Sequence, residues 1–335
     1  MPTVLVTESI HADGLAMLRD RPGLDVVEGW TLAPEALRAA EARADALLVR
    51  FHRCDAAFFG RAPKLRIVAR YGVGVDLIDL HAARDRGVTV AITADANTQS
   101  VVEHATWMLL SLAKPFDRWR RGMAGLASLT REQWSTLTPS RFASRDEGLG
   151  GELGGRTLLV IGLGRIGRRV AQVACALGMR ILVVDPYVER APGESLGYRF
   201  APSLAEALPQ ADFVTVHCPR NAETFGMVGA TELTLLPAGA AVVNCARGGI
   251  VDEAALAEAL ARGHLSGAGI DVFDAEPPPP DHPLLALPNV FLTPHAAAAT
   301  REAAWRMSTH AARNVLEFLD GRLDPANVYP VPPRA

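Results

Sequence analysis

The chain has 335 residues, which is more than one ordinary domain needs and suits two. Hydrophobic residues make up 49% and charged residues 21%, a profile typical of a globular protein and not of a disordered one. The net charge of −3 offers no basic surface to nucleic acid or an anionic membrane, and no apolar run is long enough to span a bilayer. We therefore expect neither a nucleic-acid nor a membrane partner.

The start of the chain, residues 1–6, lacks the basic-then-apolar layout of a signal peptide. The four cysteines show neither a CxxC pair nor metal-ligand spacing, which favours reduced thiols and no metal site. We therefore expect a cytoplasmic protein.

The first hundred residues alternate short apolar runs with helical patterns. Strands are expected at 3–7, 24–27, 46–49, 66–69 and 88–92, and helices at 14–19 and 34–43. Such alternation predicts a parallel sheet covered by helices on both faces.

An apolar stripe of helical period then runs from Ser100 to Arg121, and Ser100 and Glu103 have the spacing of a capping box. The next residues, 122–155, are rich in Gly, Ser and Thr and contain Trp134 and Phe142. We expect this stretch to be a loop or arm between domains.

From residue 157 the alternation restarts more strongly. Six strands are expected at 157–161, 181–185, 213–217, 241–244, 269–272 and 290–293, with helices between them at 166–177 and 253–261 among others. This pattern predicts a doubly wound dinucleotide fold. The last helix, 300–319, is expected to pack back on the first domain.

Residues 162–167 read GLGRIG, a GxGxxG motif that follows the first of these strands and opens a helix. Gly162 would allow the tight turn, Gly164 the approach of a pyrophosphate, and Gly167 close packing of helix on sheet. Asp185, eighteen positions after Gly167, ends the next strand, where a carboxylate binds the adenosine ribose and repels a 2′-phosphate. The expected cofactor is NAD.

Three later strand ends carry the side chains that reduction of a 2-keto acid requires. Arg247 follows one strand, two carboxylates of the segment DVFDAEP (271–277) follow the next, and His295 follows the last. A cation can hold the substrate carboxylate, and a histidine can exchange a proton near neutral pH. Because ligands bind at the carboxyl ends of strands in open α/β sheets, these segments are expected to converge.

These motifs, with RYGVGVD at 70–76, HCP at 217–219, NCARGGIVDE at 244–253 and TPH at 293–295, stand in one collinear order. In this the chain resembles the D-isomer-specific 2-hydroxyacid dehydrogenases from about Val4 to Leu319. The resemblance implies an NAD-dependent oxidoreductase that interconverts a small 2-keto acid and a D-2-hydroxy acid. It also implies an α/β fold of two Rossmann-like domains, in which an NAD domain (99–298) is inserted into a discontinuous, flavodoxin-like substrate domain (1–98 and 299–335).

Residue by residue, the resemblance implies that Arg247 binds the substrate carboxylate and carbonyl. It makes His295 the acid–base residue and Glu276 the carboxylate that raises its proton affinity. Asp271 would bind the nicotinamide carboxamide. The cofactor would be lined by Arg165, Ile166, Cys218 and Cys245, and the substrate carboxylate bound by the backbone of Val73 and Gly74. The family's usual dimers lead us to expect a homodimer through helix 100–121 and the arm.

Arg50 and Arg70 occupy positions that in the phosphoglycerate dehydrogenases of this family face a charged substrate tail. Each is equally well explained as a structural ion pair, so hydroxypyruvate or glyoxylate reduction is an equal alternative, and no regulatory domain is expected after Leu319. Glu276 argues against a formate dehydrogenase, which has Gln there, and Val73 against a phosphite dehydrogenase, which has Lys. An NAD-sensing corepressor on the same fold is the non-enzymatic alternative.

Two departures from the family are visible. Residues 296–299 are four alanines where a Gly is usual, which is expected to narrow the space beside nicotinamide, and Leu77 replaces a common Asn. His217 is expected to be structural. No partner is evident from the sequence for three other histidines, His104, His264 and His310.

Overall fold

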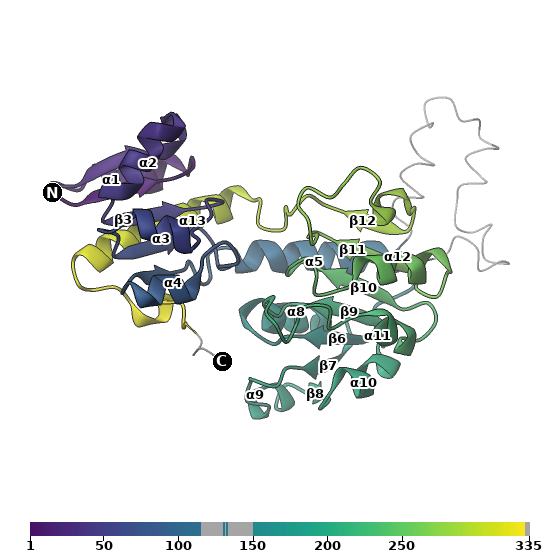
Figure 1. Cartoon of the computed structure of the whole chain (residues 1–335). Coiled ribbons are helices and arrows are strands. Elements are labelled where there is room, and N and C mark those ends of the chain that lie inside the picture. The colour runs from purple at the N-terminus through teal and green to yellow at the C-terminus, as the bar shows by residue number, and fades with distance from the viewer. Residues whose placement is uncertain (115–129, 131, 133–149, 332–335) are drawn as a thin grey trace. The chain divides into compact units, whose positions relative to one another are not determined.

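The computed structural model describes residues 1–114, 130, 132 and 150–331. The chain divides into two compact units, one made of Met1–Ser100 with Ala298–Ala335 and the other of Val101–Ala297. Each unit is built around its own sheet (Figure 1).

The first unit has five parallel strands in the order β2-β1-β3-β4-β5, which is the flavodoxin-like order. Its elements are β1 (Thr3–Val6), α1 (Ala12–Arg19), β2 (Asp25–Glu28), α2 (Pro34–Arg43), β3 (Ala46–Val49), α3 (Ala56–Arg61), β4 (Ile67–Arg70), α4 (Leu80–Asp85), β5 (Thr89–Ala91) and α13 (Arg301–Leu319). The central strands β1 and β3 are buried along their whole length, because apolar side chains face a separate hydrophobic core on each side of the sheet.

Helix α13 completes this unit from the far end of the sequence. It packs on α1, β3 and β4, as expected for the last helix (Figure 1). The contact with α1 is close: a Cβ on Gly14 would lie 2.2 Å from Ser308 Oγ. Ser308 Oγ donates to the carbonyl of His11 at 3.0 Å, and Trp305 Nε1 donates to Asp13 at 2.8 Å. A side chain at position 14 would therefore separate the two helices.

The second unit has seven parallel strands in the order β12-β11-β10-β9-β6-β7-β8. Its elements are β6 (Thr157–Ile161), α8 (Arg165–Ala176), β7 (Arg180–Val184), α9 (Ala191–Glu194), β8 (Arg199–Phe200), α10 (Leu204–Ala207), β9 (Phe213–Val216), α11 (Ala230–Leu235), β10 (Ala241–Asn244), α12 (Glu253–Ala261), β11 (Gly267–Ile270) and β12 (Val290–Leu292). The predicted pair of doubly wound parallel sheets is confirmed.

The expected count of six strands in this unit was wrong by one. The additional strand, β8 at the sheet edge, has two residues, too few for an alternating pattern to show in the sequence. Along this sheet the order reverses between β6 and β9, and the crevice at such a reversal is where open α/β sheets bind dinucleotides.

Helix α5 (Thr98–Ala113) begins two residues before the predicted start. The rest of the predicted helix up to residue 121 lies outside the described residues, and so does the predicted arm with Trp134 and Phe142. Among the helices of the described ranges, none combines the length and apolar character needed to cross a membrane.

Candidate active site

The glycine loop between β6 and α8 lies at the reversal point of the second sheet. Gly162 has φ +89°, and a Cβ there would lie 2.7 Å from the backbone nitrogen of Cys218, which follows β9. A Cβ on Gly167 would lie 2.0 Å from the carbonyl oxygen of Gly162. Contacts within the protein thus require two of the three glycines. A Cβ on Gly164, by contrast, would meet nothing within 4 Å among the described residues, so this side of the loop is open to a ligand.

The open side fits a dinucleotide. Gly164 is the N-cap of α8, a twelve-residue helix, and as a glycine it has no side chain with which to cap the N-terminal amides. A helix N-terminus of this kind attracts phosphate. Arg165 is exposed and Ile166 half-buried at the first turn of α8, and their predicted role in lining a cofactor stays a prediction.

Asp185 follows β7 and faces the same loop. Its Oδ2 accepts the backbone N–H of Leu163 at 2.7 Å, and its Oδ1 accepts the N–H of Tyr187 at 2.8 Å. The carboxylate is therefore fixed beside the glycine loop, and each oxygen retains a further lone pair for a ribose hydroxyl. Ribose binding itself stays a prediction.

Two cysteines border this region. Burial raises the pKa of Cys218 to about 11, and burial also raises the pKa of Cys245 far above its ordinary value. Cys245 Sγ lies 3.6 Å from Met108 Sδ. Both side chains are therefore neutral packing groups near neutral pH and not nucleophiles.

The loop after β10 is pressed against the loop after β11. A Cβ on Gly248 would lie 1.9 Å from the carbonyl carbon of Phe273, so only glycine allows this contact. Asn244, at the end of β10, closes the turn: its Nδ2 donates to the carbonyl of Arg247 at 2.9 Å. Arg247 is half-buried and is thereby held next to the segment that carries Glu276.

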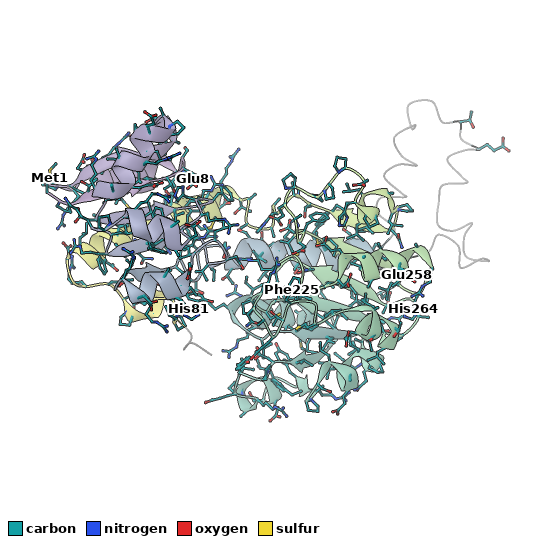
Figure 2. The ribbon with its side chains drawn as sticks, in the orientation of Figure 1. Met1, Glu8, His81, Phe225, Glu258 and His264 are labelled. Carbon is teal, nitrogen blue, oxygen red and sulfur yellow. The ribbon has the colours of Figure 1, made fainter. Side chains whose placement is uncertain are left out.

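The second glycine, Gly249, has φ +75°, and a Cβ there would lie 2.8 Å from the ring of Phe225, which is labelled in Figure 2. Arg220 lies over the same ring at 4.8 Å and forms an ion pair with Asp274 at 2.8 Å. These contacts fix the Arg247 loop from its outer side.

His295 and Glu276 form an exposed hydrogen-bonded pair. His295 Nδ1 lies 2.8 Å from Glu276 Oε2, and the two side chains are 48% and 38% exposed. Glu276 Oε1 accepts the backbone N–H of Phe273 at 3.0 Å. Burial alone would raise the pKa of Glu276, but the hydrogen bonds from His295 and Phe273 outweigh it and lower that pKa. The carboxylate is therefore ionised near neutral pH and orients the imidazole so that Nε2 points away from Glu276.

The backbone at His295 is unusual, because its φ is +51° and a non-glycine residue rarely adopts that conformation. Asp271, fully buried, holds it: its carbonyl accepts the His295 N–H at 2.7 Å, and its carboxylate accepts the N–H groups of Ala296 at 2.7 Å and Ala297 at 3.0 Å. The predicted contact of Asp271 with a nicotinamide carboxamide is a separate role and stays a prediction.

One residue of this region was missed in the sequence. No partner of His104 was evident from the sequence, but its Nε2 lies 3.0 Å from Thr293 Oγ1 and 3.6 Å from Asp271 Oδ1. His264 likewise has a partner, the carbonyl of Leu233 at 3.2 Å. His217 was expected to be structural, and its surroundings agree with that expectation. Burial lowers its pKa to about 4, and its Nε2 lies 2.8 Å from Thr215 Oγ1.

The four predicted substrate residues lie in the first unit. Arg70 Nε donates to the carbonyl of Gly74 at 2.7 Å, and its Nη1 donates to the carbonyl of Tyr71. The Arg70 side chain thus shapes the loop that presents Val73 and Gly74, which are half-buried. Binding of the substrate carboxylate by this loop stays a prediction.

Arg50 belongs to the same unit but is held differently. Its guanidinium stacks 4.9 Å from the centroid of Phe51 and 5.0 Å from that of Tyr71. Glu8, labelled in Figure 2, accepts the backbone N–H groups of Arg50 and Phe51 at 2.9 and 3.0 Å.

A glycine loop at the reversal point, a fixed acidic residue after the next strand and a His–carboxylate pair after later strands define a dinucleotide-binding α/β protein. Residues 107–297 match the model of the NAD binding domain of the D-isomer specific 2-hydroxyacid dehydrogenases. The chain is 38% identical over 96% of its length to a D-3-phosphoglycerate dehydrogenase of Methanocaldococcus jannaschii, but spans only 58% of that relative. It is 37% identical over 97% of its length to a glyoxylate reductase of Korarchaeum cryptofilum and covers 95% of it.

Solved structures of similar fold lead to the same family. A D-lactate dehydrogenase from Aquifex aeolicus, solved with NAD and lactic acid, is 27% identical with a TM-score of 0.83 over 99% of this chain and 100% of that one. The TT0316 protein of Thermus thermophilus is 38% identical with a TM-score of 0.80 over 97% of this chain and 99% of that one. The chain belongs to the D-isomer specific 2-hydroxyacid dehydrogenase family, and its second unit contains that family's NAD-binding domain.

Proposed function

We propose that the protein is an NAD-dependent dehydrogenase that interconverts a small 2-keto acid and the corresponding D-2-hydroxy acid. The observation that carries this proposal is the exposed His295–Glu276 pair, 2.8 Å from Nδ1 to Oε2, at the carboxyl edge of a sheet that also presents the glycine loop. Two relatives, a phosphoglycerate dehydrogenase and a glyoxylate reductase, are named for acids of this class.

The proposed reaction divides its tasks among three residues and the cofactor. The bound cofactor supplies the hydride that reduces the carbonyl carbon. Arg247 holds the substrate carboxylate and polarises the carbonyl, as a guanidinium does well. His295 gives the proton on Nε2 to the carbonyl oxygen in reduction and takes it back in oxidation. Glu276 keeps Nδ1 protonated and stabilises the imidazolium form by its charge.

Two kinds of substrate are proposed, because the roles of Arg50 and Arg70 can be interpreted in two ways. If they face a phosphorylated tail, the substrate is 3-phosphohydroxypyruvate; if they only shape the loop of Val73 and Gly74, it is hydroxypyruvate or glyoxylate. The bonds of Arg70 to two backbone carbonyls support the second interpretation, and the several phosphoglycerate dehydrogenase relatives support the first.

The deciding experiment measures NADH oxidation with glyoxylate, hydroxypyruvate, 3-phosphohydroxypyruvate and bulkier 2-keto acids. We expect turnover of at least one small acid. In Arg70→Ala, a KM raised about ten- to a hundred-fold for the phosphorylated acid alone would identify a tail-binding arginine. Equal effects on all acids would identify a loop-shaping one. Tight NADH binding without turnover of any acid would contradict the proposal and favour a cofactor-sensing binding protein.

We propose NAD over NADP as the cofactor because the Asp185 carboxylate is fixed beside the glycine loop, where it would repel a 2′-phosphate. The ratio of kcat/KM for NADH over NADPH is expected to exceed one, and Asp185→Ser is expected to lower it by removing the negative charge. A wild-type ratio below one would contradict the assignment.

We also propose a homodimer that works in the cytoplasm. The apolar pattern that the sequence shows at 100–121 and in the predicted arm with Trp134 supports the dimer, and all four cysteines are free, which suits a reducing compartment. Light scattering at micromolar concentration is expected to give twice the chain mass of 35.7 kDa.

A further inference from the structure

His104 lies within hydrogen-bond distance of the segment that carries the acid–base residue, although it lies on a helix far away in the sequence. It stands in the second turn of α5, and its side chain is only 17% exposed. Its Nε2 lies 3.0 Å from the hydroxyl of Thr293, two residues before His295.

The direction of this hydrogen bond follows from counting protons. Thr293 Oγ1 donates its single hydrogen to Asp271 Oδ1 at 2.6 Å. The Thr293 oxygen can then only accept in its contact with His104, so His104 Nε2 is the donor. The result is a chain of donors that runs from His104 through Thr293 to Asp271.

The buried carboxylate at the end of this chain shapes the loop around His295. Besides the Thr293 hydroxyl it accepts the N–H groups of Ala296 and Ala297, and the same residue's carbonyl accepts the His295 N–H. These bonds enclose His295, whose positive φ needs support from its surroundings. A shift of Thr293 or Asp271 would therefore displace the imidazole from Glu276.

We propose that His104 is a positioning residue for the acid–base pair: through Thr293 and Asp271 it fixes the backbone that presents His295. It touches neither Glu276 nor His295 itself. The inference rests on the proposed function, in which His295 transfers the proton, and adds a residue that sequence motifs did not identify.

Substitutions of His104 can separate the effect of its hydrogen-bond donor from the effect of its ring packing. The His104 ring packs on Trp107 with centroids 5.3 Å apart, so His104→Phe keeps an aromatic ring there but removes the donor. His104→Gln loses the ring but places an amide N–H at the same number of bonds from Cα. Thr293→Val removes the middle of the chain, and Thr293→Ser keeps it.

The first experiment compares kinetics in the full-length proteins. His104→Phe and Thr293→Val are each expected to lower kcat about ten-fold, with KM for the 2-keto acid changed by less than about two-fold. His104→Gln and Thr293→Ser should recover most of that loss. The double variant His104→Phe/Thr293→Val should be no slower than the worse single variant, because both break one chain.

The second experiment needs no turnover. Hydrogen–deuterium exchange without added cofactor is expected to show faster exchange of the amides of 296 and 297 in His104→Phe than in wild type or His104→Gln. His264→Phe is the matched control: it also removes one imidazole donor bond in the same unit, at a residue that follows α12 and is labelled in Figure 2. It should change neither kcat nor this exchange.

Loss of kcat in His104→Gln but not in His104→Phe would show that ring packing, not the donor, matters and would overturn the inference. So would unchanged exchange at 296 and 297 in His104→Phe. Wild-type protein that turns over no 2-keto acid would instead refute the proposed function, and the exchange result would still decide whether His104 holds the loop.

Discussion

The second unit contains two histidine–carboxylate pairs with the same separation and different surroundings. His295 Nδ1 lies 2.8 Å from Glu276, and His282 Nε2 lies 2.8 Å from Glu253. The first pair is 48% and 38% exposed, whereas the second is 12% and 14% exposed. Distance alone therefore does not identify an acid–base pair.

The difference lies in the ring nitrogens. His282 also accepts the N–H of Leu284 on Nδ1, at 3.4 Å, so both nitrogens serve the protein. His295 uses Nδ1 for Glu276, and Nε2 has no partner within the described part of the chain. A proton can thus leave or reach His295, whereas His282 caps a short helical turn and links it to Glu253.

The largest expected effect on rate comes from His295→Ala. Loss of the proton donor should lower kcat by roughly 10²–10⁴-fold. NADH affinity, measured by fluorescence titration, should stay nearly unchanged because the glycine loop and Asp185 are intact. A kcat within a few-fold of wild type would show that His295 is not the acid–base residue.

Glu276→Gln should have the next largest effect, about ten-fold on kcat at the optimum. The amide can still bond to the ring but has no charge to favour imidazolium, so the falling limb of the reduction profile should move to lower pH. The oxidation profile should rise at correspondingly lower pH. If both profiles keep their positions, Glu276 does not act through His295.

Glu253→Gln should mainly lower the stability of the fold and change kcat little, which is the reverse of the effect expected for Glu276→Gln. Glu253 accepts both the Asp274 N–H at 2.6 Å and the His282 ring, and an amide would oppose its N–H group to that of the ring. The expected loss is about 1–3 kcal/mol in the free energy of unfolding, measured by urea denaturation. Its kcat should fall by less than about three-fold. A loss of rate as large as in Glu276→Gln would erase the distinction between the two pairs.

The smallest effect concerns acid stability. The pKa of Glu276 is lower in the folded protein than its ordinary value of 4.5, so its ionised form stabilises the fold above that pH. This contribution is lost as pH falls through the lowered pKa. Because the side chain is 38% exposed, solvent screening should limit the contribution to about 0.5 kcal/mol. The stability difference between wild type and Glu276→Gln should accordingly shrink on acidification below about pH 4.5.

The sequence allowed prediction where a physical requirement is local. Strands β3 and β10 were predicted at the bounds observed, because each is a compact apolar run next to a turn. The need for glycine at 162 and 167 was also recognisable, since both positions belong to one strand–turn–helix motif.

What could not be predicted depends on long-range contacts. His104 is 189 residues from Thr293 in the sequence, and nothing near it indicates a partner. The short helices α3 and α4, six residues each, leave too little periodicity to detect. Residue type alone likewise does not reveal that the Arg70 side chain donates hydrogen bonds to backbone carbonyls of its own loop.

The contact of α1 with α13 has a consequence for the order of synthesis. The first hundred residues leave the ribosome without one of the two helices that cover one face of their sheet, and that helix follows only after residues 101–297. At roughly 5–20 residues per second, the delay is about 10–40 s. During this time the apolar face that will receive α13 has only α1 of the two helices that cover it, while the inserted unit can already fold. The unit that begins first is therefore completed last, and the nascent chain should depend on chaperones mainly through its N-terminal sheet.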